Sequence, residues 1–196
     1  PSQRKILFSC IKRKLKDEIK VAQLAGYTSE HAAYHHGETS LHGAIINMAQ
    51  NYVGSNNINL LTPNGQFGTR LLGGKDAASP RYVFTQLSTI TNLVFHPHDA
   101  PLYQYLQDDG QTIEPAFYLP VIPMVVVNGS KGIGTGWSTN IPPHNPNDII
   151  HYLEQRLRNG PVTPLVPWFR GFKGSVVADN SNFVMTGCWN WIGSHC

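Results

Sequence analysis

The stretch GGKDAASPRYVFTQL, residues 73–87, carries a tyrosine directly after an arginine. A tyrosine hydroxyl is a good nucleophile only once ionised, and an ordinary tyrosine pKa of about 10 means that ionisation at neutral pH needs help. Lys75 and Arg81 could offer positive charge to an anionic substrate. Attack by Tyr82 on a phosphodiester is therefore one interpretation. The alternative is that the Tyr82 ring packs in a core, as tyrosines commonly do.

Small residues precede this tyrosine and would let the backbone approach a substrate closely. Glycine adds no side chain and tolerates unusual backbone angles, while Pro80 restricts the turn. The small residues are Gly73, Gly74, Ala77, Ala78 and Ser79.

Two adjacent histidines, His35 and His36, follow Tyr34 in the stretch YHHGETS. The pair lacks the carboxylate or cysteine partners expected of a metal site, so we predict no metal site in this chain. From the residues alone, a structural role ahead of a helix competes with a role in binding. We interpret the HPH motif at residues 96–98 and the remaining histidines as surface residues.

The glycine-rich stretch GSKGIGTGW, residues 129–137, could be a dinucleotide or phosphate loop. Such loops lead from a strand into a helix, but here WSTNIPP follows, and its prolines block a helix. We therefore predict a hairpin whose tip carries Ile133. The sequence contains neither a Walker-type loop nor a clustered D-x-D motif.

Two amphipathic helices are expected near the N-terminus. Helical spacing predicts the first over residues 2–12, and the second should follow YHHGETS with Thr39 or Ser40 as its N-cap. The Gly- and Asn-rich residues 53–76 predict a hairpin followed by a loop. Helices followed by a hairpin "wing" indicate a winged-helix domain, a helix-turn-helix with a wing, over residues 1–108. The two apolar faces are Ile6, Leu7, Cys10 and Ile11, and Leu41, Ala44, Ile45, Met48 and Ala49.

The character of the sequence changes after about residue 108. The apolar, β-branched run YLPVIPMVVVNG, residues 118–129, predicts a buried strand that its prolines bend or place at an edge. Asn145 or Asn147 should cap a helix that ends at Asn159-Gly160. The inward residues of that helix would be Ile149, Ile150, Leu153 and Leu157.

Residues 171–187 return to strand-like alternation around a turn at Asp179-Asn180. The fold class is therefore α+β, with the winged-helix domain followed by residues 109–196. This second region is interpreted as the truncated start of a mixed α/β tower domain.

Composition indicates a folded, soluble, intracellular protein. The 196 residues are 41% hydrophobic and 14% charged, and no run of about 18 apolar residues or signal peptide is visible. Cys10, Cys188 and Cys196 are widely spaced, so we expect free thiols.

Basic residues concentrate at the N-terminus. Residues 1–20 hold seven of them against two acidic ones, a local charge of +5 within a net charge of +3. This indicates either an anionic partner or a solvated helix face. The seven are Arg4, Lys5, Lys12, Arg13, Lys14, Lys16 and Lys20.

Several of these motifs together resemble the eukaryotic and viral branch of the type IIA DNA topoisomerases, topoisomerase II. They are GQFGTRLLGGKDAASPRY, QRKILF, KVAQLAGY, AAYHHGETSL, NYVGSNNINLL and EPAFYLPVIPMVVVNGSKGIGTGWST. Their order is that of the family over residues 1–187, and the PRY motif distinguishes this branch from gyrase-type enzymes. Only the tail CWNWIGSHC matches poorly.

The resemblance implies a role for each candidate residue. Tyr82 would attack DNA to form a 5′-phosphotyrosyl link, and Arg81 would stabilise the transition state. Ile133 would wedge between base pairs and bend the DNA. The residues implied to contact duplex DNA are Tyr34, His35, His36, Lys75 and Ile133.

The resemblance also implies an ATP-hydrolysing isomerase that relaxes supercoils and decatenates DNA. It would be a nuclear homodimer whose Mg²⁺ and ATP are bound by domains absent from this chain, so that the chain alone would be inactive. Two alternatives stay open from the residues: a non-catalytic winged-helix DNA-binding module and a structural dimerisation piece.

Overall fold

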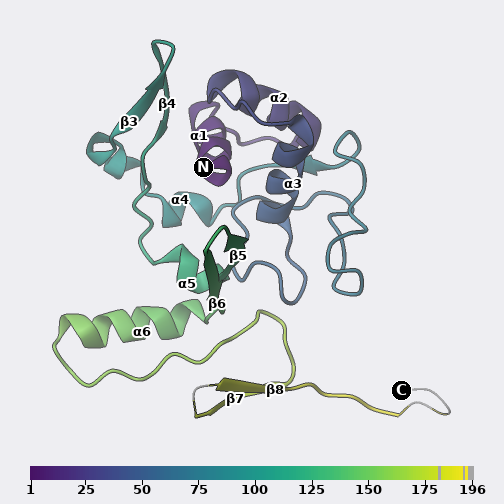
Figure 1. Ribbon diagram of the computed structural model, residues 1–196, viewed down its shortest axis with the longest axis vertical. Helices are drawn as coiled ribbons and strands as arrows, with labels where there is room; N and C mark the ends of the chain where they lie inside the picture. The colour runs from purple at the N-terminus through teal and green to yellow at the C-terminus, as the bar shows by residue number, and fades with distance from the viewer. Residues whose placement is uncertain (181, 192, 194–196) are drawn as a thin grey trace. The chain divides into compact units, whose positions relative to one another are not determined.

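The computed structural model describes residues 1–180, 182–191 and 193, which form two compact units, Pro1–Val121 and Ile122–Cys196 (Figure 1). Each unit is mixed helix and strand, and every sheet formed by the described residues is two-stranded and antiparallel. The predicted boundary at residue 108 coincides with the end of a strand inside the first unit. The first unit contains α1 (Ser2–Lys12), β1 (Ile19–Lys20), α2 (Val21–His31), α3 (Glu38–Ala49), β2 (Phe84–Thr85), α4 (Thr91–Val94), the 3-10 helix η1 (Pro97–Leu102), β3 (Tyr105–Asp108) and β4 (Gln111–Pro115).

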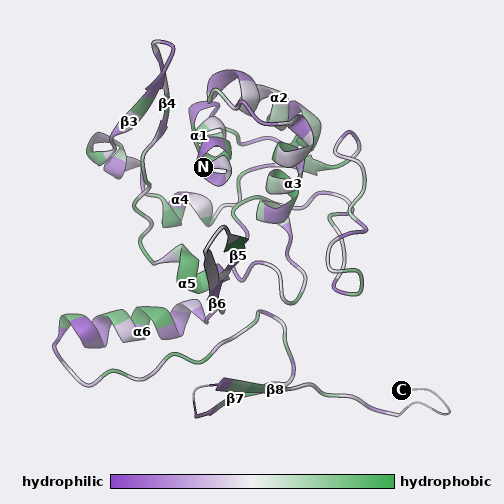
Figure 2. Ribbon diagram, viewed as in Figure 1, coloured by the Kyte–Doolittle hydropathy of each residue, from purple (hydrophilic) through white to green (hydrophobic). Residues whose placement is uncertain are grey.

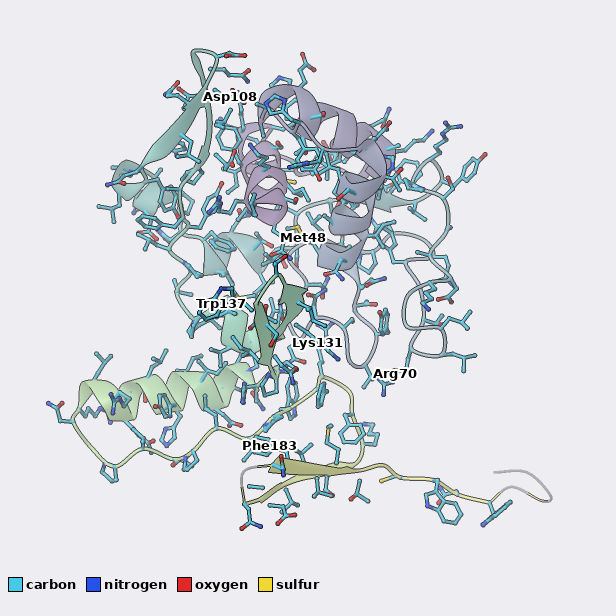
Figure 3. All side chains as sticks on the ribbon, viewed as in Figure 1. Met48, Arg70, Asp108, Lys131, Trp137 and Phe183 are labelled. Carbon is cyan, nitrogen blue, oxygen red and sulfur yellow. The ribbon has the colours of Figure 1, made fainter. Side chains whose placement is uncertain are left out.

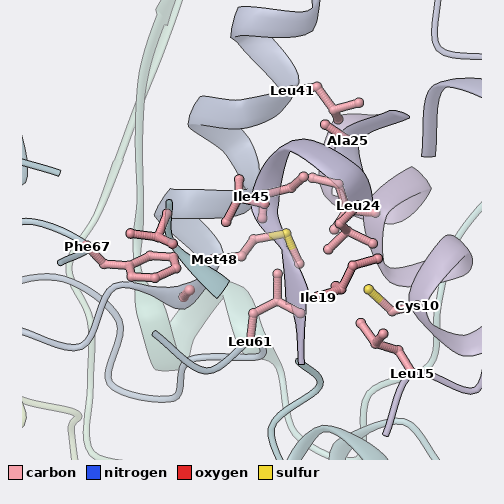
Figure 4. Close-up of a cluster of buried hydrophobic side chains, with 14 of the residues drawn as sticks. Cys10, Leu15, Ile19, Leu24, Ala25, Leu41, Ile45, Met48, Leu61 and Phe67 are labelled. Atoms are coloured by element: carbon pink, nitrogen blue, oxygen red, sulfur yellow. The ribbon is translucent and has the colours of Figure 1, made fainter. Parts of the chain in front are cut away.

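The core of the first unit lies between α1, α2 and α3 (Figure 4). Each helix buries one stripe of apolar side chains, as the spacing of these residues requires. The predicted helix over residues 2–12 is confirmed, although Ile11 is 42% exposed rather than part of the stripe. Helix α2 was not predicted. The buried cluster includes Ile6, Cys10, Val21, Leu24, Leu41, Ile45, Met48, Leu61, Phe67 and Val83.

Helix α3 begins earlier than predicted. Gly37 occupies the N-cap position and makes no side-chain cap, so the expectation of Thr39 or Ser40 as the cap was wrong. Glu38 lies in the first turn, where a negative charge is favourable beside the helix N-terminus. The Ser40 hydroxyl instead accepts a hydrogen bond from the Tyr34 hydroxyl at 3.2 Å.

The hairpin expected within residues 53–76 is also wrong. This segment is mostly turn, and its antiparallel contacts are isolated bridges to later residues, such as Asn64 with Phe84 and Phe67 with Ala77. Strands β1 and β2 pair beside them, with Lys20 opposite Phe84. The turn residues were recognised correctly, but their bridging partners lie after residue 76, outside the segment. Three helices and a small sheet are what a winged helix requires, and that finer assignment stays a prediction.

The β3–β4 hairpin is attached to α1 by a buried ion pair. Lys5 Nζ lies 2.9 Å from Glu114 Oε2, and their side chains are 13% and 2% exposed. Lys5 also donates to the Ala32 carbonyl, and the Arg4 guanidinium donates to the Ala116 carbonyl. Arg4 and Lys5 therefore find oxygen partners inside this unit.

The second unit begins with a helix where a strand was expected. It contains α5 (Met124–Asn128), β5 (Ser130–Gly134), β6 (Trp137–Ile141), α6 (Pro146–Leu157), β7 (Ser175–Asp179) and β8 (Asn182–Thr186). Pro120 and Pro123 cannot donate to a strand ladder, whereas Pro123 is tolerated immediately before a helical turn. Val127 is buried on that turn, so tertiary packing outweighs the strand preference of its β-branched residues.

The remaining elements of this unit follow the predictions more closely. Asn145 caps α6 by accepting from the Asn147 N–H at 2.9 Å, and Asn159 adopts a positive φ beyond the helix end. Of the predicted inward residues of α6, Ile149 is buried but Ile150 and Leu157 are 43% and 84% exposed. The β7–β8 hairpin is confirmed.

Figure 2 colours each element by the hydropathy of its residues. The β3–β4 hairpin is largely hydrophilic, whereas α5 is hydrophobic. Within the described ranges, none of the helices combines the length and hydropathy that crossing a bilayer would require.

Candidate nucleic-acid interface

Tyr82 projects from the first unit instead of packing in its core. The side chain is 77% exposed, which removes the core alternative for this residue within the chain. The neighbouring Arg81 is exposed, whereas Val83 is 2% exposed and packs in the core. The Tyr82 N–H donates to the Ser79 carbonyl at 2.9 Å and closes a turn. The turn therefore presents the arginine and the tyrosine to solvent together.

The turn is held against the first turn of α2. The Val21 N–H donates to the Val83 carbonyl and the Ala22 N–H donates to the Pro80 carbonyl, both at 3.0 Å. The first N–H groups of a helix have no partner within the helix. In this chain α2 satisfies two of them with the carbonyls of the tyrosine turn, so the turn and the helix stabilise each other.

Lys75 lies on a tightly folded loop that precedes this turn. Gly68 and Gly74 approach so closely that a Cβ atom on Gly68 would lie 2.5 Å from Gly74 Cα. Both glycines have positive φ, at 96° and 81°. The loop exposes Lys75 and Arg70, and the second of these was missed from the sequence (Figure 3). The signal for it was the symmetry of TRLLGGKD, in which a cation adjoins each end of the loop.

The three residues of the YHH motif have different environments. The Tyr34 ring is 7% exposed and belongs to the core cluster, so the structure places it beneath the surface and not on it. His36 is exposed, with its ring centroid 5.5 Å from that of Tyr34 in an edge-on arrangement. His35 Nε2 lies 2.8 Å from Asp108 Oδ2 at the tip of β3, and its side chain is 74% exposed.

The interpretation of the remaining histidines as surface residues is wrong for His144. That residue is 8% exposed, and its backbone N–H donates to the Val126 carbonyl at 3.0 Å. His42 is only 17% exposed and lies 3.3 Å from Glu38 across one helical turn. The residues HPH do lie outside the core, where His96 accepts from the His98 N–H as an N-cap.

Ile133 lies near the tip of the β5–β6 hairpin, as predicted. It is opposite Ser138 in the register and 91% exposed, so it is not a core residue of this chain. Lys131 lies two residues away on the same face, whereas Trp137 is opposite Gly134 on the other face and is 86% exposed (Figure 3). The hairpin thus displays one large apolar side chain on each face.

The cysteines and acidic residues show no gathered donor set. Cys10 and Cys188 are free thiols, while Cys196 lies outside the described residues. Burial raises the pKa of the Cys10 thiol to about 12. In the described part of the chain, no three His, Cys, Asp or Glu side chains form a set that could hold a metal ion.

Comparison with known proteins shows what the chain is similar to. The family model for the DNA gyrase/topoisomerase IV A-subunit matches residues 1–193. DNA topoisomerase 2 from Bombyx mori is 59% identical over 187 residues, or 95% of this chain, and its counterpart from Saccharomyces cerevisiae is 57% identical over 176 residues, or 90% of this chain. The chain spans 12% of the length of each of these two relatives.

A solved structure of a topoisomerase II domain is also similar to this chain. The crystal structure of the Plasmodium falciparum topoisomerase II DNA-binding, cleavage and re-ligation domain superposes with a TM-score of 0.95 and 51% sequence identity. The match covers 98% of this chain and 26% of that one.

Proposed function

Because this chain belongs to the DNA gyrase/topoisomerase IV A-subunit family and is similar to DNA topoisomerase 2 over most of its length, we propose that it is the part of a type IIA topoisomerase that cuts and reseals DNA. The observation that carries the proposal is the exposed Tyr82 beside the exposed Arg81, on a turn fixed by the N-terminus of α2.

In the proposed reaction the Tyr82 oxygen bonds to a DNA phosphorus as the bond from that phosphorus to the 3′ oxygen breaks. The phenol loses its proton and the departing 3′ oxygen gains one. The products are a 5′-phosphotyrosyl link and a free 3′ hydroxyl. One phosphodiester replaces another, so the reverse reaction reseals the strand without a nucleotide. Arg81 would donate to the nonbridging oxygens as their charge grows.

The remaining candidates would hold duplex DNA around this reaction. Exposed Lys75, His35 and His36 would contact the duplex, and Ile133 would wedge between base pairs. Tyr34 would contribute mainly by supporting the neighbouring His36, since its own ring is buried.

The whole enzyme would be a homodimer, because two tyrosines are needed to cut both strands, and it would act in the nucleus. ATP hydrolysis would drive strand passage, and both ATP and Mg²⁺ would be bound outside this chain. The described residues of the chain offer no set of three His, Cys, Asp or Glu side chains to hold a metal, so the Mg²⁺ would be held by ligands outside them. We expect the 196-residue chain alone to bind duplex DNA weakly and not to cleave it.

The test is a chimera in which the matching part of this chain, 90% of its length, replaces the aligned 176-residue segment of the Saccharomyces cerevisiae relative. The chimera should leave protein covalently attached to the 5′ ends of cut DNA. Tyr82→Phe should bind DNA and form no adduct, because only the nucleophilic oxygen is lost. Arg81→Ala should slow cleavage by about a hundredfold, and Arg81→Lys should slow it less because the charge remains.

Two results would contradict this proposal. An adduct that persists in Tyr82→Phe would place the nucleophile elsewhere. DNA binding without any adduct in the unaltered chimera would favour a non-catalytic DNA-binding module.

A further inference from the structure

The loop that carries Lys75 is closed at its base by one carboxylate. Asp76 Oδ1 accepts from the Thr69 N–H and Asp76 Oδ2 accepts from the Thr69 hydroxyl, both at 2.8 Å. The Gly74 N–H also donates to the Thr69 carbonyl at 2.9 Å. Because a carboxylate only accepts, its two oxygens match the two donors of a threonine. We define residues 69–76 as the clamped loop.

The clamped loop is also packed from outside. A Cβ atom on Gly74 would lie 2.4 Å from Gln50 Nε2 and 2.7 Å from the Tyr52 hydroxyl, and the φ of 81° would strain any other residue there. Just beyond the clamp, Phe67 forms an antiparallel bridge with Ala77. The base of the loop is therefore hydrogen-bonded and closely packed, while its tip exposes Leu71 at 89% and Leu72 at 54%.

Thr69 and Asp76, whose hydrogen bonds we call the clamp, are the immediate neighbours of the two cations of the loop. Arg70 follows Thr69, and Lys75 precedes Asp76. The paired hydrogen bonds thus fix the backbone from which each basic side chain leaves, and the Arg70 guanidinium is held in addition by donating to the Val53 carbonyl at 3.2 Å. A flexible glycine-containing loop would have to lose that freedom on binding, which weakens binding.

We propose that Asp76, through its paired hydrogen bonds to Thr69, is a positioning residue that preorganises Arg70 and Lys75 to contact two DNA phosphates. The inference rests on the proposed function, because DNA is the ligand. Unlike the cations, Asp76 would not touch DNA. Its negative charge is tolerated near phosphates because both oxygens are turned to Thr69.

The electrostatics of the loop agree with this geometry. The hydrogen bonds from the backbone and then the hydroxyl of Thr69 hold the pKa of the Asp76 carboxyl below its ordinary value of 3.8. The carboxylate is therefore ionised at any pH at which DNA binding would be measured.

The experiment measures the affinity of the 196-residue chain for a short duplex at several salt concentrations. Each phosphate contact contributes a slope of about −0.9 to the logarithm of affinity against the logarithm of salt. Asp76→Ala and Thr69→Val should each weaken binding by roughly tenfold at low salt. Each should also make the salt slope shallower by the amount that about one to two phosphate contacts contribute. Melting curves run beside these measurements establish that each variant is folded.

Conservative variants provide the matched controls. Thr69→Ser keeps both donors and should bind normally. Asp76→Asn keeps one acceptor and can donate an amide hydrogen to the Thr69 hydroxyl oxygen. The loop should therefore stay closed, and the salt slope should not change. With Arg70 and Lys75 both changed to alanine, adding Asp76→Ala should have no further effect, because its action passes through those cations.

Three outcomes would overturn the inference. Tighter binding by Asp76→Ala with an unchanged or steeper slope would mean that Asp76 only repels DNA. If Asp76→Ala weakened binding equally in the variant that lacks both Arg70 and Lys75, Asp76 would not act through those cations. If Asp76→Ala fails to melt cooperatively, Thr69→Val serves as the test, because it keeps the backbone hydrogen bond. An unchanged salt slope in Thr69→Val would refute the role of the clamp.

The measurements distinguish failure of the proposed role of Asp76 from failure of the proposed function. Normal binding with no effect of the clamp variants overturns the clamp alone. Absence of binding by the unaltered chain to any duplex overturns both.

Discussion

The Val21 N–H donates to the Val83 carbonyl at 3.0 Å, and both side chains are buried in the same core cluster. This single contact joins the first residue of α2 to the residue that follows Tyr82. The exposed tyrosine is therefore one residue away from a position that the core fixes. The relationship explains how a side chain that is 77% exposed can still have a defined backbone position.

Val21→Pro should test that contact, because proline removes the N–H yet fits the first position of a helix. Lys20 already has φ −60° and ψ 139°, the conformation that a following proline favours. We expect adduct formation by the chimera to fall further than in Val21→Ala, by the equivalent of about 1 kcal/mol for one hydrogen bond. Val21→Ala controls for the lost side chain. Equal adduct yields in the two variants would show that the hydrogen bond does not position Tyr82.

Ile133→Ala should reduce DNA bending by the chimera without destabilising the chain. Ile133 is 91% exposed, and exposed substitutions usually change stability by less than about 0.5 kcal/mol. Bending a site costs on the order of 1–6 kcal/mol, and a wedge that fills the opened step recovers part of that cost. Energy transfer between dyes at the ends of a duplex measures the bend. Ile133→Leu, which keeps an apolar side chain of similar size, should bend DNA nearly normally, and unaltered bending by Ile133→Ala would refute the wedge.

Glu114→Leu should destabilise the first unit strongly, because it leaves the charged Lys5 without its carboxylate partner at 13% exposure. Breaking a buried ion pair from one side costs about 3–5 kcal/mol, whereas replacing both partners by apolar residues is often nearly neutral. The double variant Lys5→Met with Glu114→Leu should therefore regain most of the loss. Urea unfolding curves measure both. If the double variant were no more stable than the single one, packing of the hairpin and not charge would explain the effect.

Cys10 should resist alkylation at pH 8 while Cys188 reacts. Burial raises the pKa of Cys10 from 9.0 to about 12, so its thiol is neutral as well as inaccessible, whereas Cys188 is exposed. Tandem mass spectrometry of tryptic peptides locates the label, and Cys10 should gain it only in denaturant. Because the folded pKa is raised, the contribution of this thiol to stability should be complete below pH 9.0 and should fall as the pH rises toward about 12. Labelling of Cys10 in the folded chain as fast as Cys188 would contradict its burial.

Local patterns predicted those elements whose signals are short in range. The α1 helix, the Asn145 cap of α6 and the β5–β6 hairpin each depend on residues a few positions apart. The strand predicted at residues 118–129 failed because β-branched residues favour a strand only where neighbours can pair with them. The hairpin predicted at residues 53–76 failed because its bridges join it to residues after position 76, and turn chemistry does not show which segments meet.

The sequence by itself determined the family and the candidate chemistry, because motifs such as PRY specify residue types and their spacing whatever their environment. It could not decide which of those residues reach solvent. Tertiary structure alone decided that Tyr82 is exposed and Tyr34 is buried, since burial depends on the packing of α1, α2 and α3. It also decided that Asp76 meets Thr69, because hydrogen bonds across a loop require the whole loop to close.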